Sequence, residues 1–98
     1  MQNNINTDNL TVVHEKDNNR FTMAINGEIA KVVYQLRDHK MYLTYSEVPF
    51  KLRGKGYGKE LVESSFEQLT QEGYKAVAVC SYIKAVARRS EKWNSIIE

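Results

Sequence analysis

The sequence RGKGYG at residues 53–58 separates two halves of the chain that have different hydrophobic patterns. Before it, apolar residues largely alternate with polar ones, which is typical of half-buried strands. After it, apolar residues recur in steps of three and four across residues 57–72, which predicts an amphipathic helix. A glycine-rich loop at the start of a helix favours phosphate binding, because the first helical N–H groups are unpaired and the helix dipole attracts anions.

Three glycines in this segment, Gly54, Gly56 and Gly58, let the backbone approach a phosphate closely. The surrounding cations are Lys51, Arg53, Lys55 and Lys59. The segment is not a P-loop, because no glycine stands five positions before Gly58 and no Ser or Thr follows Lys59. It also departs from the dinucleotide-binding fingerprint, since its third glycine comes one residue early and four predicted antiparallel strands precede it.

The first half of the chain predicts an antiparallel meander of four strands, at residues 10–15, 20–25, 28–36 and 41–48. Asn26-Gly27 is a strong hairpin signal, since both positions tolerate the positive φ of a type I′ turn. Pro49 ends the fourth strand because it has no N–H to donate to a sheet.

The second half predicts a helix at residues 57–72, ended by Gly73 in a left-handed conformation. An apolar run at 75–80 then predicts a buried strand parallel to the fourth, and Ser81 is expected to cap a helix reaching Arg89. Residues 91–98 fit a final helical turn. The order β-β-β-β-α-β-α predicts an α+β protein with a mixed sheet, forming one domain over residues 10–98 after a frayed segment at 1–9.

Composition excludes several classes of protein. The net charge of +2 is weak for a nucleic-acid binder. Cys80 is the sole cysteine, so no internal disulfide forms, and no zinc-ligand spacing exists. Neither a secretory signal nor an apolar run of membrane-spanning length is present. We therefore expect a cytoplasmic monomer that binds no metal, membrane or nucleic acid.

Residues 53–58 also resemble the Arg/Gln-x-x-Gly-x-Gly/Ala signature of the GNAT superfamily of acetyl-CoA-dependent N-acetyltransferases, with Arg53, Gly56 and Gly58 at its fixed places. Strand, proline, loop, long helix, buried strand and helix follow in the order that this family uses. Residues 46–49 and 80–83 are similar to the compact GNAT-like subgroup, and the resemblance covers residues 10–95. It implies a minimal GNAT-like fold and an acyltransferase that uses acetyl-CoA.

The resemblance also implies roles for individual residues. The pantetheine arm would lie between the fourth and fifth strands, which puts Glu47 and Val48 near the thioester. The residues expected to hold the pyrophosphate are Arg53, Gly54, Lys55, Gly56, Tyr57, Gly58 and Lys59. Lys84, Arg88 and Arg89 either form a solvated helix face or, as the resemblance allows, reach the adenosine 3′-phosphate. Members often have a histidine where this chain has Tyr45 and another where it has Arg89; if that histidine accepts a proton in those members, this chain lacks it.

Three of these residues each have two possible roles. Glu47 is either the general base or an exposed carboxylate without a role. Cys80 either forms an acyl-enzyme or lines the pocket, where the start of the following helix would favour its thiolate. Tyr82 is a general acid or, as we favour, a packing residue. His14 and His39 are interpreted as surface residues without a role.

Three functions follow from these observations. The first is transfer of acetyl from acetyl-CoA to a small amine or to a protein or peptide amine. The second is a non-catalytic acyl-CoA binding or sensing module, because only residues 16–19 stand between the first two strands, where larger members carry helices that form the acceptor site. The third is nucleic-acid binding through exposed sheet aromatics, for which the candidates are Tyr34, Tyr42 and Tyr45.

Overall fold

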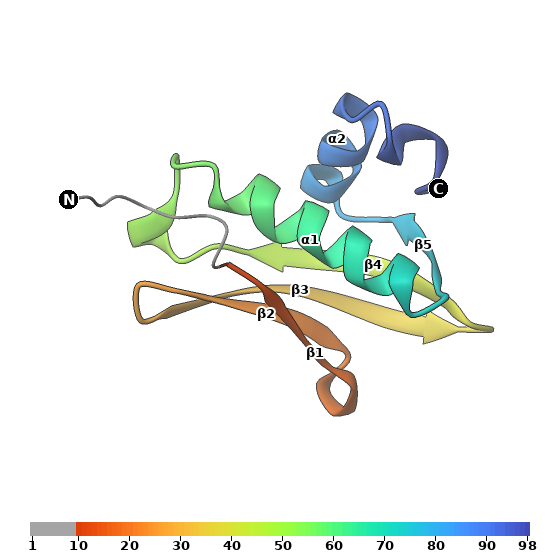
Figure 1. Cartoon of the computed structure of the whole chain (residues 1–98), viewed down its shortest axis with the longest axis horizontal. Coiled ribbons are helices and arrows are strands. Elements are labelled where there is room, and N and C mark those ends of the chain that lie inside the picture. Colours follow the sequence, from red (N-terminus) through yellow and green to blue (C-terminus); the bar gives the residue numbers. More distant parts are fainter. Residues whose placement is uncertain (1–9) are drawn as a thin grey trace.

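The computed structural model describes residues 10–98, which form a five-stranded sheet with two helices packed on one face (Figure 1). The strands are β1 (Val12–Glu15), β2 (Arg20–Ile25), β3 (Glu28–Arg37), β4 (Lys40–Glu47) and β5 (Lys75–Ala78). The helices are α1 (Tyr57–Gln71) and α2 (Ser81–Arg89), with short 3-10 turns at Lys16–Asn18, Phe50–Leu52 and Trp93–Ser95. This order confirms the predicted α+β class. The predicted frayed segment, residues 1–9, lies outside the described residues.

The strands lie in the sheet in chain order, β1-β2-β3-β4-β5. The first three pairings are antiparallel, and β5 is parallel to β4. Asn26 and Gly27 have φ values of 51° and 80°, as the predicted hairpin turn between β2 and β3 requires. Helix α1 makes the crossover from β4 to β5, because parallel neighbours cannot be joined by a tight turn.

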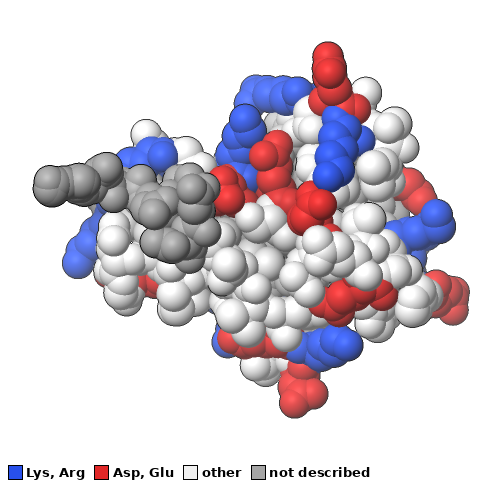
Figure 2. Space-filling model, in the orientation of Figure 1, with Lys and Arg blue, Asp and Glu red and all other residues white. Residues whose placement is uncertain are grey.

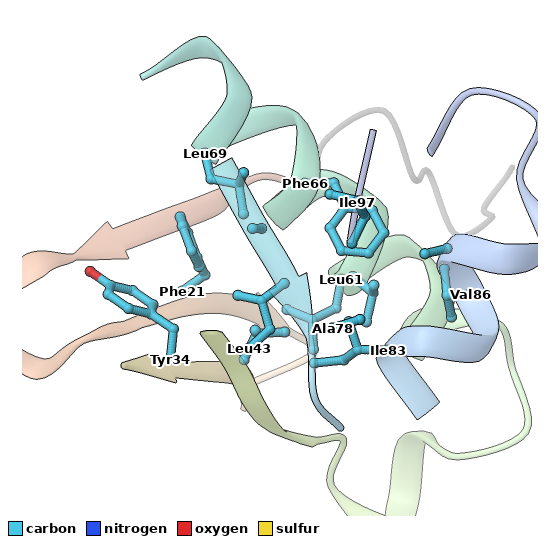
Figure 3. Packing of buried hydrophobic residues seen from close by; sticks show 14 of the residues in the cluster. Phe21, Tyr34, Leu43, Leu61, Phe66, Leu69, Ala78, Ile83, Val86 and Ile97 are labelled. Atoms are coloured by element: carbon cyan, nitrogen blue, oxygen red, sulfur yellow. The ribbon is translucent and has the colours of Figure 1, made fainter. Parts of the chain in front are cut away.

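The core fills the space between one face of the sheet and the two helices (Figure 3). Alternation in β2 puts Phe21, Met23 and Ile25 on this face, as predicted. The buried residues of α1 are Tyr57, Leu61, Val62, Ser65, Phe66 and Leu69. The other face of the sheet has no helix over it within residues 10–98, and Val13, Ile29 and Tyr45 are exposed there.

Two boundaries at the C-terminal side of the fold differ from expectation. Strand β5 ends at Ala78 rather than at residue 80, because the N–H groups of Val79 and Cys80 both donate to the Leu43 carbonyl. The prediction that Ser81 caps α2 is wrong. Cys80 is extended and occupies the cap position, so that Ser81 is already the first helical residue. Gly73 has φ +90° after α1, as predicted.

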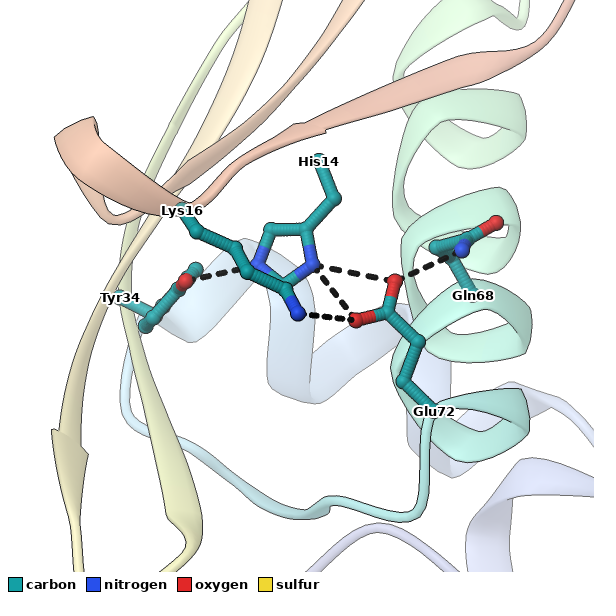
Figure 4. Close-up of polar contacts among 5 residues, drawn as sticks. All are labelled: His14, Lys16, Tyr34, Gln68 and Glu72. Atoms are coloured by element: carbon teal, nitrogen blue, oxygen red, sulfur yellow. Dashed lines mark hydrogen bonds and ion pairs between the residues drawn. The ribbon is translucent and has the colours of Figure 1, made fainter.

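A histidine clasp joins the edge strand β1 to the end of α1 (Figure 4). The His14 side chain is only 5% exposed, so its interpretation as a surface residue is wrong. Its Nδ1 donates to the Glu72 carboxylate at 2.9 Å, and its Nε2 lies 2.7 Å from the Tyr34 hydroxyl. The ring also stacks on Phe21, with 4.3 Å between centroids. These contacts bury Tyr34, which removes it from the aromatics that nucleic acid could reach, whereas His39 is an exposed turn residue as predicted.

The clasp predicts acid-sensitive stability. Burial alone would raise the pKa of Glu72, but hydrogen bonds from Gln68 and His14 outweigh it and the pKa is lowered from 4.5. A carboxyl whose pKa is lower in the folded state stabilises the fold above its unfolded pKa, and this contribution disappears as pH falls through the folded value. We expect Glu72→Gln to lower the free energy of unfolding by about 1–2 kcal/mol at pH 7, and by progressively less as the solution is acidified below pH 4.5.

Chemical denaturation across this pH range measures the effect. Glu67→Gln is the matched control, because Glu67 also lies on α1 and makes an exposed ion pair with Lys92, which lies beyond the end of α2. Its effect should stay below about 0.5 kcal/mol at every pH. If the free energy of unfolding lost in Glu72→Gln did not change with pH, the His14–Glu72 contact would not be the cause of acid-sensitive stability.

Candidate active site

The sheet opens where β4 and β5 separate. Their ladder ends at the pair Leu43 and Ala78, beyond which β4 continues to Glu47 with no partner strand on that side among residues 10–98. A β-bulge accompanies the split, because Val33 pairs with Tyr45 and Tyr34 with Leu43, which leaves Thr44 as the extra residue on β4. A bulge bends its strand and increases the local twist. The end of β4 is therefore turned away from β5.

A cleft of about 460 Å³ occupies this opening. Its walls are the end of β4, the glycine-rich loop, the start of α1 and one side chain of α2. The lining residues are Tyr45, Ser46, Glu47, Val48, Leu52, Arg53, Gly54, Gly56, Gly58, Leu61 and Tyr82. The cleft thus combines a strand edge with a helix start, as the sequence predicts.

The start of α1 supplies unpaired backbone donors to this cleft. Gly54 and Gly56 have φ values of 78° and 86°, and Gly56 holds the N-cap position without a side chain to cap the helix. The first backbone bond of the helix runs from the Glu60 N–H to the Gly56 carbonyl at 3.2 Å. Within residues 10–98, no backbone carbonyl accepts the N–H groups of residues 54–59. Such a set of free amides at the positive end of a helix dipole is suited to an anionic oxygen-rich group.

Arg53 ties the loop to the end of β4. Its Nε donates to the Val48 carbonyl at 3.0 Å, and its guanidinium lies over the Phe50 ring at 5.8 Å from the centroid. Lys55 and Lys59, two other cations of this segment, do not line the cleft. The Tyr57 side chain is buried in the core, so only its backbone N–H is available.

The two predicted catalytic residues lie on different faces of the sheet. Ser46 pairs with the buried Val32, and its Oγ lies 3.6 Å from the Cys80 Sγ on the helix-covered side. Glu47 pairs with Lys31 on the open face, with 3.6 Å between the carboxylate and Nζ. Cross-strand partners share a face, and successive residues of a strand alternate between faces. Glu47 lines the cleft, whereas Cys80 does not.

The thiol of Cys80 lies at the first turn of α2. Burial alone would raise its pKa, but the backbone amides of Ile83 and Tyr82 and the Ser46 hydroxyl favour the thiolate, and the net pKa is lowered. The start of α2 therefore favours the thiolate form of Cys80, as the sequence suggests.

Tyr82 has a more prominent place than its interpretation as a packing residue implies. The residue is 44% exposed and lines both the cleft and a second hollow of about 420 Å³ between α1 and α2. A Cβ on Gly58 would come within 2.7 Å of the Tyr82 hydroxyl, so the missing side chain at Gly58 allows this close approach. Of the three cations expected to reach the 3′-phosphate, only Arg89 lines this hollow. Arg88 donates to the Ile97 carbonyl instead.

Three features of the described residues concern metals, membranes and surface charge. Residues 10–98 contain no group of three His, Cys, Asp or Glu side chains placed to hold a metal ion. None of their helices is both long and apolar enough to cross a membrane. Basic and acidic side chains are interspersed on the face seen in Figure 2, which does not resemble the basic stripe of a nucleic-acid binder.

Comparison with known proteins gives a consistent result. The model of a family described as GCN5-related N-acetyl-transferase matches residues 20–96. The chain is similar to the protein NATD1 of Gallus gallus (27% identity) and of Danio rerio (30%), in each case over 83% of this chain and 76% of the relative. The solution structure of a GCN5-like protein from Staphylococcus aureus superposes with a TM-score of 0.66 at 22% identity, covering 92% of this chain and 89% of the other. That likeness supports the fold.

Proposed function

The chain belongs to the GCN5-related N-acetyltransferase family, and from this premise we propose that it transfers acetyl from acetyl-CoA to an amine. One observation carries the proposal: free amides at the start of α1 lie beside the gap between β4 and β5. The amides of residues 54–59 suit the pyrophosphate. The unpaired edge of β4 suits the amide-containing pantetheine arm, which would extend the sheet as a strand does.

The thioester would then lie at the end of β4, beside Glu47 and Val48. Within residues 10–98, no backbone carbonyl accepts the Val48 N–H, so this group is free to polarise the thioester oxygen. Glu47 takes a proton from the substrate ammonium, directly or through water, and the resulting neutral amine attacks the carbonyl carbon. The C–N bond forms, the C–S bond breaks, and the second proton of the nitrogen passes to the leaving thiolate, which departs as CoA.

The acceptor approaches from the open face of the sheet in this arrangement. Glu47 lies on that face, and the exposed Tyr45 donates a hydrogen bond to its carboxylate at 3.4 Å. No helix covers this side within the described residues. The open approach is compatible with a small amine and with an amine on a peptide or protein surface.

A measurement of turnover distinguishes an acetyltransferase from a module that only binds acyl-CoA. Thiol release from acetyl-CoA should depend on the protein and rise when a polyamine or a lysine peptide is added, with acetylated product found by mass spectrometry. Saturable acetyl-CoA binding without amine-dependent thiol release would favour the alternative, a non-catalytic acyl-CoA binding or sensing module. One observation favours this alternative. The carboxylate assigned as the base, that of Glu47, is already engaged in an exposed ion pair with Lys31.

Direct transfer predicts a small effect at Cys80. Because its sulfur contacts Ser46 and does not line the cleft, Cys80→Ala should change kcat by less than about threefold. Steady-state thiol release measures kcat, and intact-protein mass spectrometry after incubation with acetyl-CoA looks for an acetylated cysteine. A large loss of turnover, together with an acetyl group on Cys80 of the wild type, would show an acyl-enzyme instead.

A further inference from the structure

We infer that the preferred acceptor is an amine with a carboxylate next to the reacting nitrogen, as in an α-amino acid, and that Lys31 binds this carboxylate. The inference rests on the proposed function and extends it to the class of acceptor. Its basis is the ion pair between Lys31 and Glu47, which places a cation 3.6 Å from the carboxylate assigned as the base.

Lys31 and Glu47 form a site of mixed charge on the acceptor side of the cleft. They are cross-strand partners on β3 and β4, on the open face of the sheet, and their side chains are 33% and 43% exposed. Glu47 lines the cleft, whereas Lys31 does not. A substrate that reaches Glu47 from the open face therefore meets both charges, with Lys31 on the side away from the thioester.

This pair is complementary to a zwitterion. The ammonium and the carboxylate of an α-amino acid are joined through a single carbon atom, so they can face Glu47 and Lys31 at the same time. Each protein charge then exchanges its partner for a substrate charge of the same sign, and none is left unpaired.

An amine without a carboxylate lacks this match. Its ammonium would draw Glu47 away from Lys31, and among residues 10–98 no other carboxylate lies within 4.0 Å of the Lys31 Nζ. A second positive charge close to the reacting nitrogen, as in a polyamine, would in addition be repelled by Lys31. Such amines are therefore expected to be the poorer acceptors.

The Lys31–Glu47 pair is also easier to open than its neighbour on the same face. The Arg20 Nε lies 2.7 Å from the Glu15 carboxylate, which accepts two further side-chain hydrogen bonds. The 3.6 Å between Lys31 and Glu47 is longer, and exposed ion pairs contribute little to stability. A substrate can therefore separate these two side chains at small cost.

The transfer step proceeds as in the proposed function. Glu47 takes one proton from the substrate ammonium and the leaving thiolate takes the second, so the products are an N-acetylamino acid and CoA. Acetylation removes the positive charge of the substrate. The Lys31–Glu47 pair can then form again, which favours release of the product.

A comparison of an amino acid with its amide tests the inference. Phenylalanine and phenylalaninamide share a side chain, which can lie against the half-exposed Tyr45 ring, and differ in the carboxylate. The amide is the less basic amine and loses its proton more easily, so intrinsic reactivity favours the amide. The wild type should nevertheless acetylate phenylalanine with a kcat/KM about tenfold higher, measured by thiol release.

Substitutions of Lys31 identify the residue responsible. Lys31→Gln should lower kcat/KM for phenylalanine about tenfold and leave that for phenylalaninamide within about twofold. Lys31→Arg keeps the charge and should keep the preference. The matched control is Lys40→Gln, because Lys40 begins β4, is 32% exposed and is paired with Glu98 at 3.1 Å. This variant should show the preference of the wild type.

The outcomes separate this inference from the proposed function. Equal kcat/KM values of the wild type for the two compounds, or a Lys31→Gln variant that lowers both equally, would overturn the inference and leave the proposed function standing. Thiol release with a polyamine but with neither phenylalanine nor its amide would do the same. Absence of amine-dependent thiol release with all three would overturn the proposed function as well.

Discussion

Replacing Glu47 with Gln is expected to lower kcat for amine acetylation by about 100-fold while leaving the affinity for acetyl-CoA within about twofold. The amide keeps the size and polarity of the side chain but cannot accept the proton that the substrate ammonium must lose before it attacks. Because the reacting atoms lie beside Glu47 and the pyrophosphate lies on the loop, loss of the base should affect the chemical step alone. Steady-state thiol release gives kcat, and calorimetry gives the affinity.

Glu28→Gln is the matched control for this variant. Glu28 makes a similar exposed pair, 3.8 Å from the Lys51 Nζ, and does not line the cleft. It should retain the kcat of the wild type. The pH dependence of kcat supplies a second readout, since the limb that reports an essential base should disappear in Glu47→Gln. Unchanged turnover in Glu47→Gln would remove this carboxylate from the mechanism.

Replacing Gly56 with Val is expected to lower the affinity for acetyl-CoA by about 100-fold. Gly56 has φ +86°, where a β-branched residue is a severe outlier, so the loop must rearrange before α1 can begin. Hydrogen bonds from backbone N–H groups to a charged oxygen are worth about 1.5–3 kcal/mol each, and losing the alignment of two of them accounts for the effect.

Gly27→Val separates this effect from general strain. Gly27 has φ +80° in the hairpin between β2 and β3, and, as at Gly56, a Cβ added there would meet no other atom within 4 Å. Both variants should lose a similar free energy of unfolding, of about 1–2 kcal/mol, but only Gly56→Val should lose acetyl-CoA affinity. Equal affinities in the two variants would show that the loop does not hold the cofactor.

The features that were predicted correctly depend on short stretches of sequence. The alternation in β2, the Asn26-Gly27 turn and the helical period of α1 each reflect a local geometry that a few residues impose. The glycine-rich loop belongs to the same class, because its left-handed positions and free amides arise within six residues. The sheet order follows from the chain order and the helical crossover.

The features that the sequence did not reveal depend on contacts between distant residues. His14 and Glu72 are 58 positions apart, so nothing near His14 in the sequence indicates that its ring is buried. The bulge at Thr44 decides that Ser46 faces the helices and Glu47 the open side, and no local composition marks it. The place of Tyr82 between the cleft and the hollow likewise depends on how α2 packs beside Gly58.

In the proposed function, unpaired amides at the start of α1 hold the pyrophosphate of acetyl-CoA. A titration of isotope-labelled protein with acetyl-CoA, followed through backbone amide chemical shifts, tests it directly and needs no acceptor. We expect saturable shifts that are largest at residues 54–59, with smaller ones along the end of β4. Unchanged loop amides at millimolar acetyl-CoA, or shifts confined to another surface, would contradict it.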